Sequence, residues 1–168
     1  MSEPVRILGL DPGTRLTGYG VIDVVPGQEH RPALVDGGVI RLDDKAPLID
    51  RLCELERELV DLIAEHRPAC VAVEEIYAHY KHPKTAIIMA HARGVILLVA
   101  RRKGLGVHEL SANRVKQSLT GHGHASKEMM QRSIQATWRL AEPPDPPDVA
   151  DALAVALCCA RSGVLARA

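Results

Sequence analysis

The sequence has no phenylalanine, and aromatic residues make up only 2% of its 168 positions. Its few aromatic residues are Tyr19, Tyr77, Tyr80 and Trp138. A core must therefore be built mainly from aliphatic side chains, and the hydrophobic share of 46% is large enough for one. With 25% charged residues, this composition is typical of a globular protein and argues against a disordered chain. We expect residues 1–168 to form a single α/β domain that ends in a short loose tail.

Cysteine is also scarce, with four residues and no CxxC or zinc-finger spacing. The adjacent pair Cys158 and Cys159 lies in an apolar segment, which favours core packing over a disulfide framework or a zinc site. No apolar stretch reaches the roughly 18 uninterrupted residues that a membrane span needs. The N-terminal residues MSEPVRILG show no basic segment followed by an apolar leader, so no secretory signal is expected. These features favour the reducing cytoplasm.

Net charge is zero, but the charges are unevenly distributed along the chain. Residues 1–75 carry 8 basic and 15 acidic side chains, whereas residues 76–139 carry 11 basic and 2 acidic ones. A basic middle third between acidic ends indicates an anionic partner that binds beside an acid-lined site. A solvated basic face explains the charge distribution equally well when it is taken alone.

Apolar residues follow the periods of an α/β domain. Short apolar or β-branched runs predict strands over 5–10, 17–25, 33–42, 69–75 and 106–110. Helical spacing predicts helices over 47–65, 85–102, 113–119, 126–140 and 148–161. Short connections favour antiparallel pairing of the first three strands, and the later strands are expected to be parallel. The expected fold is a five-stranded mixed sheet flanked by helices.

Several carboxylates lie at the ends of apolar segments. Asp11 ends the first strand, Glu74 ends the fourth, and Asp148 and Asp151 share one face at the start of the last helix. Each has an ordinary explanation as a turn former, a salt-bridged strand end or an acid at a helix N-terminus. Close together they would repel one another unless divalent cations lay between them, and oxygen ligands suit Mg²⁺ or Mn²⁺. Two such ions can support the attacking water and the leaving oxygen of a phosphodiester displacement.

The basic middle of the chain combines cations with two of the aromatic residues. In the segment EIYAHYKHPK, Tyr77 and Tyr80 lie among basic residues that include Lys81 and Lys84. This pattern suits stacking on unpaired bases beside phosphate contacts, although a surface loop with incidental tyrosines would show the same pattern. In TGHGHASK, Lys127 lies near a helix start, where free N–H groups can meet a phosphate.

The predicted helix over 85–102 is apolar nearly all round, which requires burial on more than one side. One side can cover the sheet, and a symmetric partner chain is the simplest cover for the other. A wholly internal core helix is the alternative. The histidines of TGHGHASK have no further soft ligands nearby in the sequence, which disfavours a metal site there.

Five segments of the sequence resemble the motifs of one known protein family. They are ILGLDPGTRLTGYGVI (7–22), VAVEEIY (71–77), ARGV (92–95), RVKQSLTGHGHASKEMMQ (114–131) and DVADALAVA (148–156). Together and in this order they resemble the RuvC family of Holliday-junction resolvases, which have the ribonuclease H-like fold. The resemblance implies a homodimeric, Mg²⁺-dependent endonuclease of recombination and DNA repair. Two metal ions per site would support the cleavage of opposing strands of a four-way DNA junction, and the cleavage would leave 5′-phosphate ends.

The resemblance also implies roles for individual residues. The metal-binding and catalytic acids would be Asp11, Glu74, Asp148 and Asp151. Lys116 and Lys127 match basic residues that the family associates with DNA contacts and catalysis, and Tyr77 matches an aromatic assigned to the bases at the junction centre. A branch-migration motor of the RuvA and RuvB type is the further partner that the family implies.

Three other functions are compatible with parts of the sequence. A related ribonuclease H-like nuclease acting on structured RNA could use the same acids. An actin-like ATPase has a first phosphate motif similar to DPGT, but 168 residues are too few for two lobes that close on a nucleotide. A non-catalytic junction-binding scaffold would have no use for clustered acids, which lower stability when no metal is bound.

Overall fold

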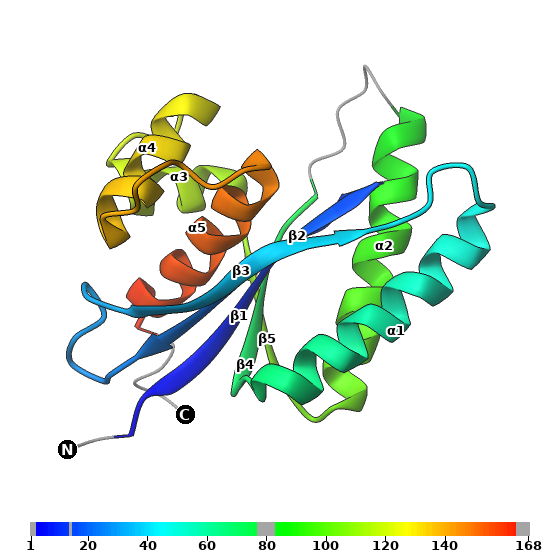
Figure 1. Cartoon of the computed structure of the whole chain (residues 1–168), viewed down its shortest axis with the longest axis horizontal. Helices are drawn as coiled ribbons and strands as arrows, with labels where there is room; N and C mark the ends of the chain where they lie inside the picture. Colours follow the sequence, from blue (N-terminus) through cyan, green and yellow to red (C-terminus); the bar gives the residue numbers. More distant parts are fainter. Residues whose placement is uncertain (1–2, 14, 77–82, 164–168) are drawn as a thin grey trace.

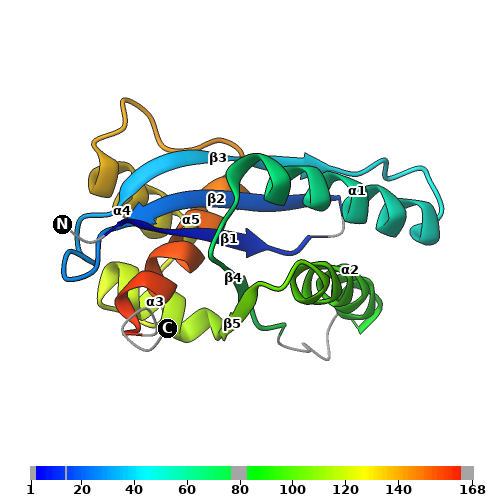
Figure 2. The ribbon, with the colours of Figure 1, turned by 90° about the horizontal axis from the view of Figure 1, so that it is seen from below.

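Five strands form one mixed sheet in the order β3-β2-β1-β4-β5. The computed structural model describes residues 3–13, 15–76 and 83–163. The strands are β1 (Val5–Asp11), β2 (Leu16–Val24), β3 (Ala33–Arg41), β4 (Cys70–Glu74) and β5 (Gly106–Leu110). Figure 2 shows them side by side in this order.

The pairing of the strands confirms the predicted mixed sheet. The β1–β2 and β2–β3 pairs are antiparallel, and the β1–β4 and β4–β5 pairs are parallel. The helices are α1 (Leu48–His66), α2 (Pro83–Arg102), α3 (Ala112–Thr120), α4 (Lys127–Trp138) and α5 (Pro147–Arg161). Their bounds differ from the predicted ranges by at most two residues, the usual uncertainty at element ends. The predicted C-terminal tail lies outside the described residues.

Helices cover both faces of the sheet (Figure 1). Because side chains alternate along a strand, Leu8 and Leu10 of β1 pack into a core with α1 and α2, whereas Ile7 packs into a second core with α5. Gly9 lies against α5, so the odd-numbered residues of β1 share that face. Asp11 continues the same alternation and is therefore directed to the α5 side at the strand end.

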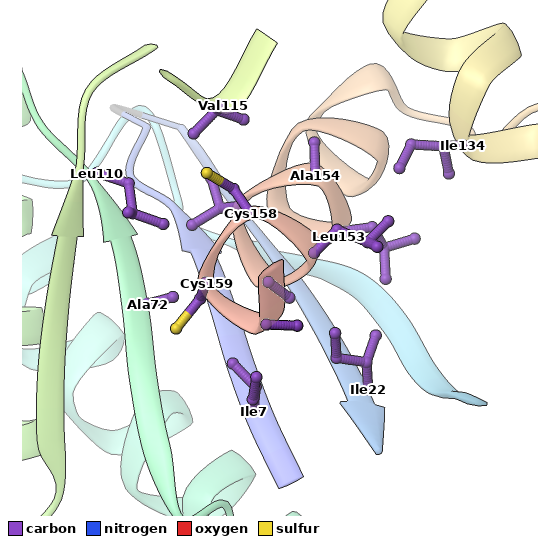
Figure 3. Packing of buried hydrophobic residues seen from close by; sticks show 14 of the residues in the cluster. Ile7, Ile22, Ala72, Leu110, Val115, Ile134, Leu153, Ala154, Cys158 and Cys159 are labelled. Atoms are coloured by element: carbon purple, nitrogen blue, oxygen red, sulfur yellow. The ribbon is translucent and has the colours of Figure 1, made fainter. Parts of the chain in front are cut away.

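Small residues bring α5 unusually close to the sheet. A Cβ atom on Gly9 would lie 2.7 Å from the Ala156 nitrogen and closer still to the Ala152 carbonyl oxygen. A Cβ atom on Gly18 of β2 would collide with the backbone of Asp148. Most of α5 is buried among aliphatic side chains such as Ile7, Ile22 and Leu153, as Figure 3 shows. The glycines therefore determine how deeply the acid-bearing start of α5 sits over β1 and β2.

Replacing Gly9 with alanine is expected to destabilise the protein by about 3 kcal/mol, because the added methyl group meets helix backbone that cannot move aside. Urea unfolding followed by circular dichroism measures the change. Gly106→Ala is the matched control, since its Cβ would lie at an ordinary 3.8 Å from the Cys70 Cβ. Equal losses in the two variants would contradict this account of α5 packing.

Helix α2 has more apolar surface than the single chain buries. Among the described residues it is the one helix whose length and composition would allow it to cross a membrane, a test that core helices also pass. It packs against α1 and β5, yet Ile87 is 58% exposed and Leu98 is 49% exposed. The alternative of a wholly internal core helix is therefore wrong for this chain.

Candidate active site

Asp11, Glu74, Asp148 and Asp151 all line one cavity of about 510 Å³. They come from the ends of β1 and β4 and from the start of α5. The structure thus brings together four carboxylates that span 141 positions of the sequence, from 11 to 151 inclusive.

Sheet register explains why Asp11 and Glu74 meet. The parallel strands β1 and β4 pair Leu10 with Val73, so the next residue of each strand lies at the same edge of the sheet. Ligands commonly gather at this carboxyl edge in α/β folds. Asp148 lies in the first turn of α5, where its charge complements the helix dipole, and Asp151 follows three residues later on the same face.

The pKa values of Asp11, Glu74 and Asp151 are raised in this cavity. Burial, followed by the charges of Asp151, Glu74 and Asp148, raises the pKa of Asp11 to about 8. Burial also raises the pKa of Glu74, with Asp151 adding to the effect. Burial raises the pKa of Asp151 as well, and the charge of Asp148 adds to it. Without a cation, the site therefore holds protons at pH values where ordinary carboxyls have lost them.

Two lysines partly offset this negative charge. Lys116 of α3 and Lys127, the first residue of α4, both line the cavity. Their charges lower the pKa values of Glu74 and Asp151, and Lys127 also lowers that of Asp11. Ser111 and Ser126 cap α3 and α4 by accepting hydrogen bonds from the backbone N–H groups of Arg114 and Met129. These caps hold the helix starts that place both lysines.

The cavity also contains residues that sequence reasoning missed. Arg15 lines it and forms an ion pair with Asp44 at 3.4 Å. Its position four residues after Asp11 in the DPGTR turn is a signal that could have indicated it. Met89 reaches the cavity from α2, and no pattern in the sequence pointed to that contact.

The remaining predicted DNA-binding residues lie away from these carboxylates or cannot be placed. Tyr77, Tyr80 and Lys81 lie outside the described residues. Lys84 is exposed in the first turn of α2 and is not among the described residues that line the cavity.

The donor set fits a hard divalent cation. All four acidic side chains offer carboxylate oxygens, the ligands that Mg²⁺ and Mn²⁺ prefer. The pKa values of three of them are raised, first by burial and then by neighbouring carboxylates, so the buried negative charges are only partly offset by the lysines. A bound divalent cation would relieve that repulsion, because it favours the ionised form of every carboxylate that it contacts.

Comparisons with known proteins agree on one family. The family model for crossover junction endodeoxyribonuclease RuvC matches residues 7–159. RuvC of Heliobacterium modesticaldum is 44% identical over 156 residues, which cover 93% of this chain and 94% of that protein. RuvC of Pelotomaculum thermopropionicum is 45% identical over 152 residues, which cover 90% of each chain.

Solved structures give the same result. T. thermophilus RuvC in complex with a Holliday junction substrate has a TM-score of 0.83 at 32% identity, with 92% of each chain covered. The yeast mitochondrial Holliday junction resolvase Ydc2 shares the fold, with a TM-score of 0.64 at 15% identity over 95% of this chain and 81% of that one. These matches extend over nearly the whole chain and decide against the actin-like ATPase that the sequence left open. The chain belongs to the RuvC family of crossover junction endodeoxyribonucleases, metal-dependent Holliday junction resolvases with a ribonuclease H-like fold.

Proposed function

We propose that Asp11, Glu74, Asp148 and Asp151 are the metal ligands with which this resolvase cleaves DNA, and that they hold two Mg²⁺ ions. The observation that carries the proposal is the meeting of these carboxylates in one cavity, where burial and mutual repulsion raise the pKa of Asp11 to about 8. Bound Mg²⁺ would supply Lewis acidity that makes a water more acidic and offsets charge on the leaving oxygen. Mn²⁺ has similar ligand preferences and is expected to substitute.

Lys127 and Lys116 are proposed to contact the scissile phosphate. Both line the cavity beside the carboxylates, so a phosphodiester that enters it meets two cations as well as the acids. Lys127 interacts electrostatically with three of the acids, namely Asp11, Glu74 and Asp151. A cation held there offsets negative charge that develops on the phosphate during displacement.

A junction-cleavage assay with and without Mg²⁺ tests this proposal, with both nicks mapped on a synthetic four-way DNA junction. We expect symmetric nicks in two opposing strands, 5′-phosphate ends and no cleavage in EDTA. A matched four-way RNA junction serves as the competing substrate. Equal cleavage of the RNA, or cleavage that persists in EDTA, would contradict the proposal.

A homodimer built on α2 is the second part of the proposed function. Ile87 and Leu98 expose apolar surface on this helix, and Met89 of the same helix lines the cavity. A two-fold interface through α2 would bury that surface and place two active sites on one junction. Paired cuts follow from such an arrangement.

Leu98→Glu is expected to weaken the dimer at least about 100-fold, because it places an unpaired charge in the interface. Sedimentation velocity over a concentration series measures the dissociation constant. Ile49→Glu on α1 is the matched control, since Ile49 is 70% exposed and lies on a different helix. If both variants dimerise like the wild type, the interface does not include this face of α2.

The segment that contains Tyr77, Tyr80, Lys81 and Lys84 is proposed to bind the junction through stacked bases and phosphates. Lys84→Gln is expected to weaken junction binding and to reduce the slope of log affinity against log salt by about 0.9 for each phosphate that the protein no longer neutralises. Fluorescence anisotropy with labelled junction DNA measures both. Lys103→Gln, beyond the other end of α2, should leave both quantities unchanged, and an identical effect of the two changes would exclude a specific role for Lys84.

Three further expectations from the sequence belong to the same proposal. The chain is proposed to work as one nuclease domain in the bacterial cytoplasm. A single cooperative unfolding transition would test the first statement, and cell fractionation would test the second.

A motor of the RuvA and RuvB type is proposed as a partner. Addition of the motor proteins of the same bacterium should accelerate junction cleavage, and an unchanged rate would argue against a direct link.

A further inference from the structure

A second cluster of potential metal ligands lies outside the acidic cavity. It consists of Cys70 of β4, His108 of β5 and Cys159 of α5, whose donor atoms all lie within 4.8 Å of one another. Among the described residues, no other group of three or more histidine, cysteine or acidic side chains is this compact. None of the three residues lines the cavity that contains the acids.

Sheet register brings Cys70 and His108 together. The parallel strands β4 and β5 pair Cys70 with Gly106 and Ala72 with His108, so Cys70 and His108 lie on the same face, two positions apart. A Cβ atom on Gly106 would lie 3.8 Å from the Cys70 Cβ and 3.9 Å from the His108 Nε2. Because Gly106 has no side chain, the imidazole can reach across it toward the cysteine.

Helix α5 supplies the third donor. Figure 3 shows Cys159 directed toward β4 near Ala72, whereas its neighbour Cys158 is directed toward Val115. Cys159 is fully buried and Cys70 is 6% exposed. Cys159 and Cys70 are hydrogen-bond partners, and this contact lowers the pKa of Cys70 and raises that of Cys159. Cys158 instead has Ser118 as its hydrogen-bond partner.

We propose that Cys70, His108 and Cys159 bind one Zn²⁺ ion, with water as the fourth ligand. Two sulfur atoms and one imidazole nitrogen form a donor set typical of Zn²⁺ and unsuited to Mg²⁺. Bond lengths of about 2.0–2.3 Å place the donors of a tetrahedral zinc about 3.3–3.8 Å apart. The observed cluster therefore needs to contract by no more than about 1.5 Å to reach this geometry.

This site would tie together the elements that position the acids. Cys70 lies four residues before Glu74 on β4, about 13 Å along the strand. Cys159 lies eight residues after Asp151 on α5, about 12 Å along the helix. A zinc at this distance takes no part in phosphodiester cleavage. It links α5 to β4 and β5 and so stabilises the packing on which the acidic cavity depends.

Anaerobic titration of the full chain with Co²⁺, in excess Mg²⁺ and a thiol-free reductant, tests the proposal. Only cysteine ligands give sulfur-to-cobalt charge-transfer absorption in the near ultraviolet, so Co²⁺ bound to carboxylates is silent in this band. We expect one equivalent of Co²⁺ to saturate the band and Zn²⁺ to displace it. Zn²⁺ should also raise the melting temperature in the presence of Mg²⁺.

Variants locate the site. Cys159→Ala should abolish the band, and His108→Ala should weaken Co²⁺ affinity at least about tenfold by removing one ligand. Cys158→Ala is the matched control, because it removes an equally buried thiol from the same helix and should keep the band. Asp11→Asn should also keep the charge-transfer band, which would show that this Co²⁺ is not bound in the acidic cavity.

Several results would overturn the proposal. One is a wild-type protein that shows no charge-transfer band, and another is a band that survives Cys159→Ala but is lost in Cys158→Ala. A disulfide between Cys70 and Cys159 in the untreated protein, detected as a mass lower by two hydrogens, would show instead that the two thiols are a redox pair. If Cys159→Ala does not fold, His108→Ala tests the site instead, because the His108 side chain is only half-buried. An unchanged Co²⁺ affinity in His108→Ala would exclude the site.

Discussion

Asp11→Asn is expected to abolish junction cleavage, with a loss of at least about 10³-fold, while junction binding is retained. Asparagine keeps an oxygen at the end of β1 but removes the negative charge that would balance a bound cation. Asp11 interacts electrostatically with all three other acids of the cavity, so its charge is central to any cation held there. We expect DNA affinity to depend instead on the basic segments, which this substitution leaves intact.

Single-turnover cleavage in Mg²⁺ and junction binding in EDTA measure the two quantities separately. Glu75→Gln is the matched control, because it removes an exposed charge next to Glu74 and should leave cleavage close to that of the wild type. Normal cleavage by Asp11→Asn would remove Asp11 from the catalytic site. Loss of binding together with cleavage would show that the variant acts through DNA affinity.

The second large effect concerns the stability of the metal-free protein. Below pH 3.8 the Asp11 carboxyl is protonated in both the folded and the unfolded chain and contributes nothing to stability. As the pH rises to about 8, the unfolded chain releases this proton while the folded chain keeps it, so stability is progressively lost across this window. One pKa unit corresponds to about 1.4 kcal/mol, so the loss above pH 8 is on the order of 5 kcal/mol.

Asp11→Asn should therefore be more stable than the metal-free wild type at pH 8.5, with a melting temperature higher by about 10 °C. The two proteins should converge as the pH falls toward 4. Saturating Mg²⁺ should remove most of the difference at pH 8.5, because the cation replaces the proton on the wild-type carboxylate. Differential scanning calorimetry in EDTA and in Mg²⁺ tests this, and a stability difference that does not change with pH would contradict it.

Local patterns in the sequence were sufficient for most of the fold. The helix over Leu48–His66 and the strand Gly106–Leu110 were predicted within one residue, because each carries its own period and its own terminating residues. The cavity residues depended on more than local pattern. Asp148 and Asp151 have an ordinary role at a helix start, but their positions at the end of an apolar segment made them candidates, and the family motif then matched them to a metal site.

The sequence by itself determined the strands, the helices, the mixed sheet and the family, since periodicity and motif order can be read from neighbouring residues. Only the tertiary structure decided which side chains meet. The depth of α5 over Gly9 and Gly18, the reach of Met89 into the cavity and the meeting of Cys70, His108 and Cys159 all depend on packing between distant segments. The physical reason is that side chains from distant segments must fit together to fill the core, and this fit sets the strand register and the docking of helices. The pattern of neighbouring residues along the chain does not contain this information.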